Sequence, residues 1–201
     1  MFHGGAGLGA HERERSRMLA DLGFVAFAPD LFGEIFENRA RGIEVVTRLV
    51  EQPETLRARL ADALACLRAQ PGVDASRIGA IGFCFGGHAA IELARSARGV
   101  RGVVSFHGGL KARAPAKAGE VSAAVLACTG AADPFVTRDD RAAFEDEMTK
   151  AKVAWQMHLY GGAMHGFTHR DTQQPGCAYD DVADRRSWSA MRSLFADTLS
   201  P

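Results

Sequence analysis

Short apolar runs alternate with longer amphipathic segments along most of this 201-residue sequence. The runs contain few alternating polar residues, which is the pattern of strands buried on both faces of a parallel sheet. Such strands need helices on both sides of the sheet to cover their side chains. We therefore predict an α/β fold, a mostly parallel sheet with helices on both faces, with strands over residues 24–28, 78–82, 100–106, 125–129 and 153–160. The length suits a single domain over residues 1–201.

Amphipathic segments predict the helices that cover this sheet. Leucines recur at helical spacing over residues 56–67, after Pro53, which is favourable in a first helical turn. Thr137 and Asp140 have the spacing of a capping box that opens a further helix. Helices are also expected over about residues 86–97 and, from the apolar spacing around residues 188–199, at the end of the chain.

Composition excludes several classes of partner. Basic and acidic residues number 24 each, so the net charge is zero, and no basic cluster indicates a nucleic-acid or anionic-membrane surface. The longest largely apolar stretch, residues 78–90, is too short to span a bilayer. The first residues lack the basic and apolar regions of a secretory signal, so we expect a cytoplasmic location. The pattern leaves the oligomeric state open.

The cysteines and histidines do not have the spacing of a metal site. The four cysteines lie in unrelated contexts without a CxxC pair, which indicates neither a zinc site nor a disulfide framework. His3, His107 and His165 lie near predicted strand ends, but no carboxylate or cysteine accompanies them at ligand spacing. We therefore expect no metal and no other cofactor.

A glycine-rich turn between a strand and a helix carries the first candidate functional residue. The strand at 78–82 runs into Gly82-Phe83-Cys84-Phe85-Gly86, and small residues two positions either side of Cys84 permit a sharp turn. A helix start favours a thiolate, because its free N–H groups and dipole stabilise negative charge. The same turn offers the backbone N–H of Phe85 to an oxyanion. Cys84 is thus a candidate nucleophile, although a buried free cysteine in a turn is the ordinary alternative.

Two later strand ends supply partners for such a nucleophile. Asp133 follows the strand at 125–129, and His165 follows the strand at 153–160. In open parallel sheets, functional sites form at the carboxyl ends of the strands. The chain order nucleophile, acid, histidine is the order of α/β-hydrolase triads. We predict a triad in which Cys84 attacks, His165 is the general base and Asp133 orients the histidine.

Several motifs together resemble the dienelactone hydrolase family over essentially the whole chain. They are HGGAGLGAHERERSRMLADLGFVAFAPDLFG, DASRIGAIGFCFGG, VVSFHGG, GAADPFV, YGGAMHGF and AYDDVADRRSWSAMRSLF. The resemblance implies an α/β-hydrolase that cleaves a carboxylic ester or lactone through an acyl-thioester at the cysteine, without a cofactor. It also implies that the second oxyanion donor is the N–H of Gly5. Expected substrate contacts are Phe83, Phe167 and Arg170.

The sequence departs from this family's pattern at three places. Family members begin with further strands before the segment that opens this chain, so we expect the sheet to lack the usual N-terminal strands. Dienelactone hydrolases proper have a glutamate where Gly4 stands, and two arginines that hold the substrate carboxylate where Glu34 and His169 stand. The resemblance therefore favours a broader carboxylesterase-like activity over dienelactone hydrolysis.

Two functions of other classes remain open from the sequence. Gly5 to Ala10 also satisfies the dinucleotide pattern G-x-G-x-x-A, with Asp30 about twenty residues further on. That pattern would predict a nucleotide-binding oxidoreductase, but it requires a complete strand before the glycines. A catalytically silent binding module that keeps the fold is the other alternative, because fold does not fix function.

Overall fold

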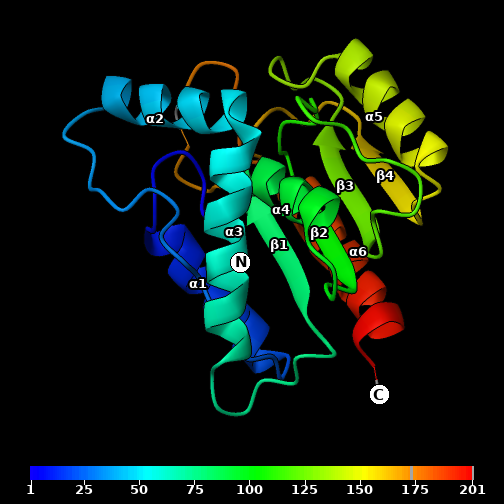
Figure 1. Ribbon diagram of the computed structural model, residues 1–201. Coiled ribbons are helices and arrows are strands. Elements are labelled where there is room, and N and C mark those ends of the chain that lie inside the picture. Colours follow the sequence, from blue (N-terminus) through cyan, green and yellow to red (C-terminus); the bar gives the residue numbers. More distant parts are fainter. Residues whose placement is uncertain (173, 201) are drawn as a thin grey trace.

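The computed structural model describes residues 1–172 and 174–200, and over these residues it contains a four-stranded parallel sheet in the order β1-β2-β3-β4 (Figure 1). The strands are β1 (Gly79–Phe83), β2 (Gly102–Phe106), β3 (Ala124–Gly130) and β4 (Trp155–Tyr160). Phe83 pairs with Phe106, and Phe106 pairs with Cys128. The carboxyl ends of the strands are therefore aligned along one edge of the sheet.

Three of the described helices precede the first strand and the other three follow β1, β3 and β4, whereas a loop joins β2 to β3. Pro53 occupies the first turn of its helix, and Thr137 Oγ1 accepts a hydrogen bond from the Asp140 N–H at 3.1 Å, so both predicted helix starts are confirmed. The sequence pattern did not indicate the first two helices. The described helices are α1 (Ala10–Asp21), α2 (Arg39–Glu51), α3 (Pro53–Arg68), α4 (Phe85–Ser96), α5 (Arg138–Lys150) and α6 (Asp181–Leu199).

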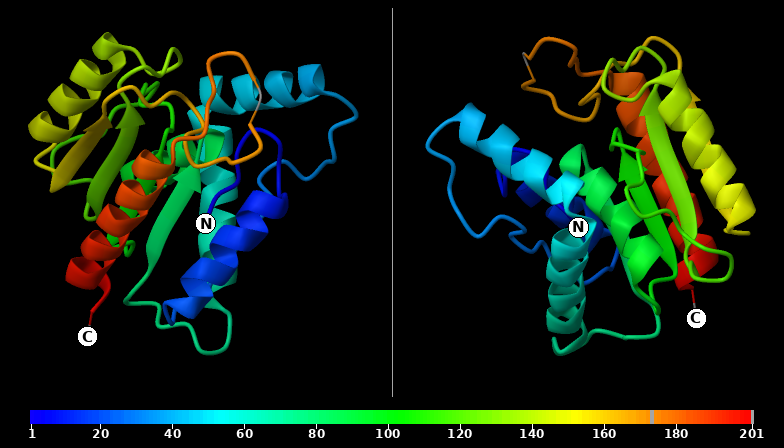
Figure 2. Two further views of the ribbon diagram at one scale, coloured as in Figure 1. Left: turned by 180° about the vertical axis from the view of Figure 1, so that it is seen from behind. Right: turned by 45° about the horizontal axis from the view of Figure 1, so that its top comes forward.

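Both faces of the sheet are buried, which explains the continuous apolar runs. On one face, Val103 and Val125 pack with α2, α3, α4 and α5 (Figure 1). On the other face, Val104 and Leu126 pack with α1 and α6 (Figure 2). The predicted α/β-hydrolase architecture, a parallel sheet with helices on both faces, is confirmed.

The predicted strand over residues 24–28 is wrong. This segment belongs to no helix or strand, and Val25 is 58% exposed. The neighbouring chain is the short segment at the amino terminus, where Phe2 forms an isolated bridge to Gly82 of β1. The Met1 ammonium group donates a hydrogen bond to the Phe27 carbonyl at 2.7 Å. A single hydrogen bond does not pair two segments as β-strands, so residues 24–28 remain irregular.

None of the helices within residues 1–172 and 174–200 combines the length and the apolar character that crossing a membrane requires.

Candidate active site

Cys84 lies at the sharp turn between β1 and α4. Its φ of 54° and ψ of −117° place it in a region that non-glycine residues rarely adopt. A Cβ on Gly82 would lie 1.9 Å from the Gly86 carbonyl oxygen, and a Cβ on Gly86 would lie 2.2 Å from the Phe2 carbonyl oxygen. The two glycines are therefore required by close backbone approach, as the pattern around Cys84 predicts.

The loops after β3 and β4 bring Asp133 and His165 together. His165 Nδ1 and Asp133 Oδ2 lie 2.9 Å apart, and Asp133 is 5% exposed. The other carboxylate oxygen of Asp133 accepts a hydrogen bond from the Phe135 N–H at 2.8 Å, which fixes the carboxyl plane. The backbone of His165 is held by a bridge to Cys177. The ring is thus oriented from two sides.

Cys84 and His165 influence each other's charge. Burial raises the pKa of the Cys84 thiol, but the hydrogen bond and charge of His165, with the backbone N–H groups of Gly5 and Phe85, outweigh burial and lower it. Burial likewise lowers the pKa of His165, but its hydrogen bonds to Asp133 and Cys84 outweigh burial and raise it to about 10. The arrangement favours a thiolate beside an imidazolium.

The two predicted oxyanion donors both favour the thiolate of Cys84. The backbone N–H groups of Gly5, in the amino-terminal loop, and of Phe85, in the first turn of α4, lower the pKa of the Cys84 thiol. A Cβ on Gly4 would lie 3.8 Å from the Cys84 Cβ, so the Gly4 backbone lies against the turn. Two backbone donors from separate elements therefore converge at this point.

His107 contacts the turn that carries Cys84. The sequence indicated only that His107 lies near a strand end, not that it makes this contact. It has no exposed surface, and its Nδ1 accepts a hydrogen bond from the Cys84 N–H at 3.1 Å. Its Nε2 lies 2.8 Å from Thr168 Oγ1, so the proton resides on Nε2 and is donated to that hydroxyl. Burial, followed by the charges of His165 and His169, holds the pKa of His107 well below its usual range.

Two of the three expected substrate contacts have no exposed surface. Phe83 and Phe167 are both 0% exposed, Phe83 stacking on Phe106 and Phe167 packing edge-on against His107. Side chains without exposed surface cannot line an open binding site, so they pack behind it instead. Arg170 is exposed, and its guanidinium lies 5.7 Å from the centre of the Tyr179 ring.

Glu34 and His169, which stand where dienelactone hydrolases proper have two arginines, contact other residues of this chain. Glu34 forms an exposed ion pair with Arg41 at 2.8 Å. His169 stacks on His11 with 3.8 Å between the ring centres. Burial lowers the pKa of both imidazoles, that of His11 to about 2, so both rings are neutral at pH 7.

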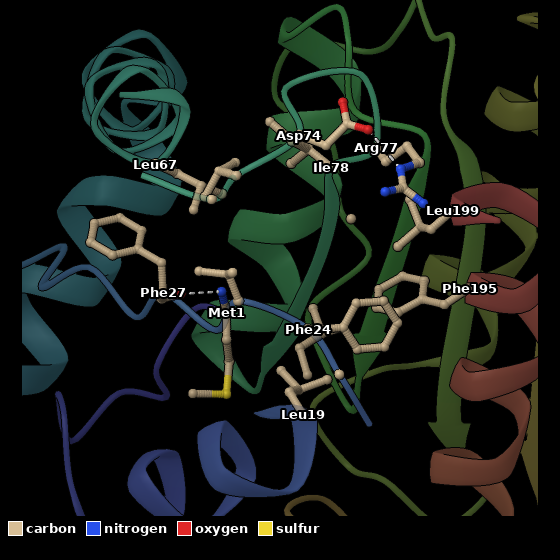
Figure 3. A pocket seen from close by; sticks show the side chains of 16 residues that line it. Met1, Leu19, Phe24, Phe27, Leu67, Asp74, Arg77, Ile78, Phe195 and Leu199 are labelled. Atoms are coloured by element: carbon tan, nitrogen blue, oxygen red, sulfur yellow. Dashed lines mark hydrogen bonds and ion pairs between the residues drawn. The ribbon is translucent and has the colours of Figure 1, made fainter. Parts of the chain in front are cut away.

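A cavity of about 240 Å³ lies at the opposite end of β1 from Cys84 (Figure 3). Its walls come from the amino-terminal segment, the start of β1 and the end of α6, including Met1, Phe24, Ile78, Phe195 and Leu199. None of the predicted site residues lines it. Over the described ranges 1–172 and 174–200, no group of three or more His, Cys, Asp or Glu could hold a metal ion.

The loop at residues 4–9 does not suit a dinucleotide. The Glu12 carboxylate accepts hydrogen bonds from the N–H groups of Gly4 and Gly9 at 3.3 and 2.8 Å. A pyrophosphate would need such N–H groups free and would be repelled by the carboxylate. Asp30 is used locally, its Oδ1 accepting from the Phe32 N–H at 2.9 Å. The oxidoreductase alternative is therefore not supported.

Comparison with known proteins shows the family and agrees with the fold. The model of the dienelactone hydrolase family matches residues 1–199. A Synechocystis protein named "Putative carboxymethylenebutenolidase" is 28% identical over 208 residues, covering 96% of this chain and 82% of that protein. The crystal structure of a dienelactone hydrolase-like promiscuous phosphotriesterase from metagenomic libraries is 40% identical, with a TM-score of 0.91, covering 99% of this chain and 85% of that one.

A dienelactone hydrolase from Anabaena variabilis shares the fold at 24% identity, with a TM-score of 0.65, covering 99% of this chain and 85% of its own. The family match extends over both helical layers and all the loops described above. The chain therefore belongs to the dienelactone hydrolase family and is an α/β-hydrolase that acts on ester or lactone bonds.

Proposed function

We propose that the protein hydrolyses a carboxylic ester or lactone with Cys84 as nucleophile, His165 as proton carrier and Asp133 as the residue that orients His165. The observation that carries the proposal is the hydrogen-bonded pair of His165 and Asp133, 2.9 Å apart, together with Cys84 at a strained strand–helix turn, where the pKa of Cys84 is lowered and that of His165 is raised. Nucleophile activation of this kind is typical of thiol hydrolases.

The proposed reaction proceeds in two steps. The Cys84 thiolate attacks the carbonyl carbon, and the carbonyl oxygen moves between the N–H groups of Phe85 and Gly5, whose stabilisation of the oxyanion is commonly the largest catalytic effect. The imidazolium of His165 protonates the leaving alcohol, and an acyl-thioester remains on Cys84. Neutral His165 then takes a proton from water, which attacks the thioester and releases the acid. The thiolate–imidazolium pair is restored at the end.

We further propose that the substrate is uncharged near the reacting group. Glu34 and His169 stand where dienelactone hydrolases proper have carboxylate-binding arginines; Glu34 is acidic and already paired, and burial keeps the His169 ring neutral. An anionic substrate would therefore lose hydration without gaining a cation. An uncharged phosphotriester is a second candidate substrate, because a relative that is 40% identical is described as a promiscuous phosphotriesterase.

Intact-protein mass spectrometry during reaction with p-nitrophenyl acetate tests the nucleophile. We expect a transient acyl adduct that maps to Cys84 and that prior treatment with iodoacetamide abolishes. Cys84→Ala should lower turnover by about 1,000-fold or more. Cys177→Ala, a half-buried cysteine outside the proposed triad, is the matched control and should retain activity. Turnover by folded Cys84→Ala at the wild-type rate would refute the proposal.

A pair of esters that differ only in charge tests the substrate class. We expect kcat/KM for p-nitrophenyl butyrate to exceed that for the p-nitrophenyl monoester of succinic acid by about 10-fold or more, since discrimination of 1.4 kcal/mol corresponds to tenfold. The rates at two ionic strengths separate screening by salt from local contacts. Equal kcat/KM for the two esters would contradict an uncharged preference.

The location and domain organisation are also proposals. We propose that residues 1–201 form one domain, because both apolar cores share the same sheet. A cytoplasmic location rests on the sequence composition alone. Fractionation of cells that express the native protein would test the location.

A further inference from the structure

The peptide unit that joins Gly4 to Gly5 lies directly beside the nucleophile. A Cβ on Gly4 would lie 3.6 Å from the Phe83 carbonyl oxygen and 3.8 Å from the Cys84 Cβ. The N–H of Gly5 belongs to this unit, and it lowers the pKa of the Cys84 thiol. Glycine is the most flexible residue, so two adjacent glycines need external contacts to hold one orientation.

His3 supplies the first of these contacts, and its tautomer follows from its partners. The Leu31 N–H donates to His3 Nε2 at 2.9 Å, so this nitrogen carries a lone pair. The proton is therefore on Nδ1, which lies 2.8 Å from the Gly4 carbonyl oxygen and donates to it. His3 is 0% exposed, and burial lowers its pKa, so the ring is neutral at pH 7.

The Gly4 carbonyl oxygen also accepts a hydrogen bond from the Gly7 N–H at 3.1 Å. Two donors on one oxygen fix the plane of the peptide unit. In a trans peptide the C=O and N–H groups point in opposite directions, so holding the Gly4 oxygen aims the Gly5 N–H away from His3. Donation to the carbonyl also polarises the unit and strengthens its N–H as a donor.

Glu12 holds the preceding peptide unit. Its carboxylate accepts from the Gly4 N–H at 3.3 Å and from the Gly9 N–H at 2.8 Å, and the residue is 4% exposed. It stands in the first turn of α1, where the helix dipole favours a carboxylate. The side chain therefore spans the loop from its first glycine to its last and ties it to α1.

We propose that His3 and Glu12 are positioning residues that hold the Gly4–Gly5 peptide unit with its N–H directed at the oxyanion formed on attack by Cys84. The inference rests on the proposed function, because it assigns a task in that reaction. His3 fixes the carbonyl end of the unit, and Glu12 fixes the N–H of the unit before it. Neither side chain touches the substrate.

Two reactions of Cys84 separate this role from general support of the fold. Acylation by p-nitrophenyl acetate develops an oxyanion, whereas alkylation by iodoacetamide needs only the thiolate. Alkylation is measured above pH 9.5, where the thiolate is formed in every variant.

Three variants change the contacts of the Gly4–Gly5 loop. His3→Leu removes the donor to the Gly4 oxygen, and His3→Asn retains an N–H at about the position of Nδ1. Glu12→Gln replaces a carboxylate oxygen by an NH₂ group. The controls are His158→Asn on β4 and Glu14→Gln on the exposed face of α1.

We expect His3→Leu to slow acylation about 10- to 100-fold. This is less than the loss of about 100- to 1,000-fold that follows removal of a whole oxyanion donor, because the Gly5 N–H itself is retained. His3→Asn should recover part of that loss, and Glu12→Gln should slow acylation about 10-fold. The limiting alkylation rate should stay within about twofold of wild type in all three, and circular dichroism should be unchanged. Both controls should match wild type in both reactions.

Wild-type acylation in folded His3→Leu and Glu12→Gln would overturn the inference. So would an equal fall in acylation and limiting alkylation, because that pattern indicates a displaced Cys84. The proposed function fails by a different result, namely that the wild-type protein forms no acyl adduct at Cys84. The two failures are therefore distinguishable in one set of measurements.

Discussion

At the scale of single residues, the chemistry of Cys84 depends on a balance between burial and three hydrogen-bonding or charged neighbours. Burial alone would favour the neutral thiol, which is what happens at Cys128, where burial raises the pKa to about 12. At Cys84 the His165 ring and two backbone N–H groups reverse the sign. The partners of each cysteine therefore decide the direction in which its pKa moves.

The pH dependence of alkylation follows from that sign. A lowered pKa keeps Cys84 as a thiolate below the usual value of about 8.5, and reactivity is lost only as pH falls through the lowered pKa. We expect iodoacetamide to modify Cys84 selectively near pH 7, while Cys177, whose pKa is raised by burial, reacts at higher pH. Peptide mapping after alkylation between pH 5 and 10 would check this. A Cys84 profile that rises only above pH 9 would contradict it.

Asp133→Asn separates orientation of His165 from the fold. The amide can retain the acceptor contact with the Phe135 N–H but loses the charge that stabilises the His165 imidazolium. We expect esterase kcat to fall about 1,000- to 10,000-fold, as for other triads that lose this carboxylate, and the alkylation profile to move to higher pH. Asp139→Asn in the exposed first turn of α5 is the control. An unchanged kcat would remove Asp133 from the mechanism.

At the scale of elements, the turn between β1 and α4 requires glycine, because backbone atoms lie so close together there that a side chain would clash with them. Gly82→Ala places a Cβ within 1.9 Å of a backbone oxygen, and backbone cannot rotate away as a flexible side chain can. We expect a loss of at least about 3 kcal/mol in the free energy of unfolding, the upper range for overpacking. Gly161→Ala meets nothing within 4 Å and should lie within about 0.5 kcal/mol of wild type in urea unfolding. Equal stabilities would refute the steric account.

How much of each element could be predicted from sequence depends on whether its signal is local. The buried strands and the turn around Cys84 have local signals, namely apolar runs and paired glycines, and these predictions are confirmed. The segment at 24–28 has the same apolar signal but lacks a full partner strand, which no local pattern contains. Helix α1 was not predicted because two of its three buried residues are Glu12 and Arg15, so its sequence contains no apolar stripe.

The same distinction applies to the site. Residue types at strand ends predicted that Cys84, Asp133 and His165 would meet, because parallel strands bring their carboxyl ends together. The contacts of His3 and Glu12 depend on loop geometry across the chain. The spacing of Gly9 and Glu12 at a helix start, as in a capping box, was the one signal available for Glu12.

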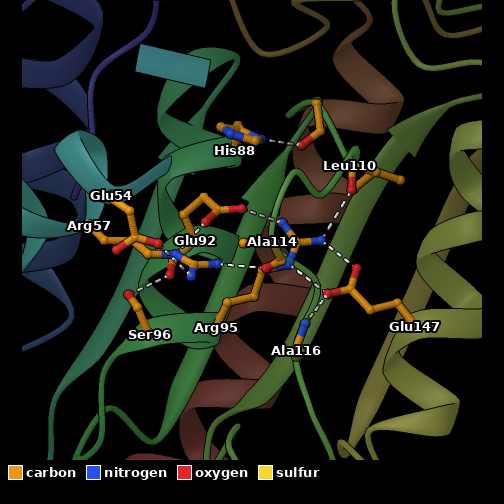
Figure 4. Close-up of polar contacts among 11 residues, drawn as sticks. Glu54, Arg57, His88, Glu92, Arg95, Ser96, Leu110, Ala114, Ala116 and Glu147 are labelled. Carbon is orange, nitrogen blue, oxygen red and sulfur yellow. Dashed lines mark hydrogen bonds and ion pairs between the residues drawn. The ribbon is translucent and has the colours of Figure 1, made fainter. Parts of the chain in front are cut away.

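At the scale of the whole molecule, a buried ion network joins the helices on one face to the loop that follows β2 (Figure 4). Arg95 of α4 is 0% exposed at its side chain and pairs with Glu92 at 2.8 Å and with Glu147 of α5 at 2.6 Å. It also donates to the Leu110 carbonyl, and Glu147 accepts from the Ala116 N–H. The network thus fixes the loop that begins at His107, next to the nucleophile.

Arg95→Met should destabilise the molecule because it removes the cation that pairs with the buried Glu147 carboxylate, whereas Glu92 keeps its pair with Arg57 at 2.9 Å. Removing one partner of a buried ion pair costs about 3–5 kcal/mol, mostly from the uncompensated charge. We expect that loss in urea unfolding at pH 7, and a smaller loss for Arg95→Met combined with Glu147→Gln, in which the uncompensated carboxylate is absent and the Arg57–Glu92 pair is retained. Arg98→Met, on the exposed end of the same segment, is the control and should change stability by less than about 0.5 kcal/mol. If Arg95→Met unfolds at the same urea concentration as Arg98→Met, the network contributes no stability, and the loop after β2 must be held by its other contacts, such as that between His88 Nδ1 and the Gly109 carbonyl oxygen at 3.1 Å.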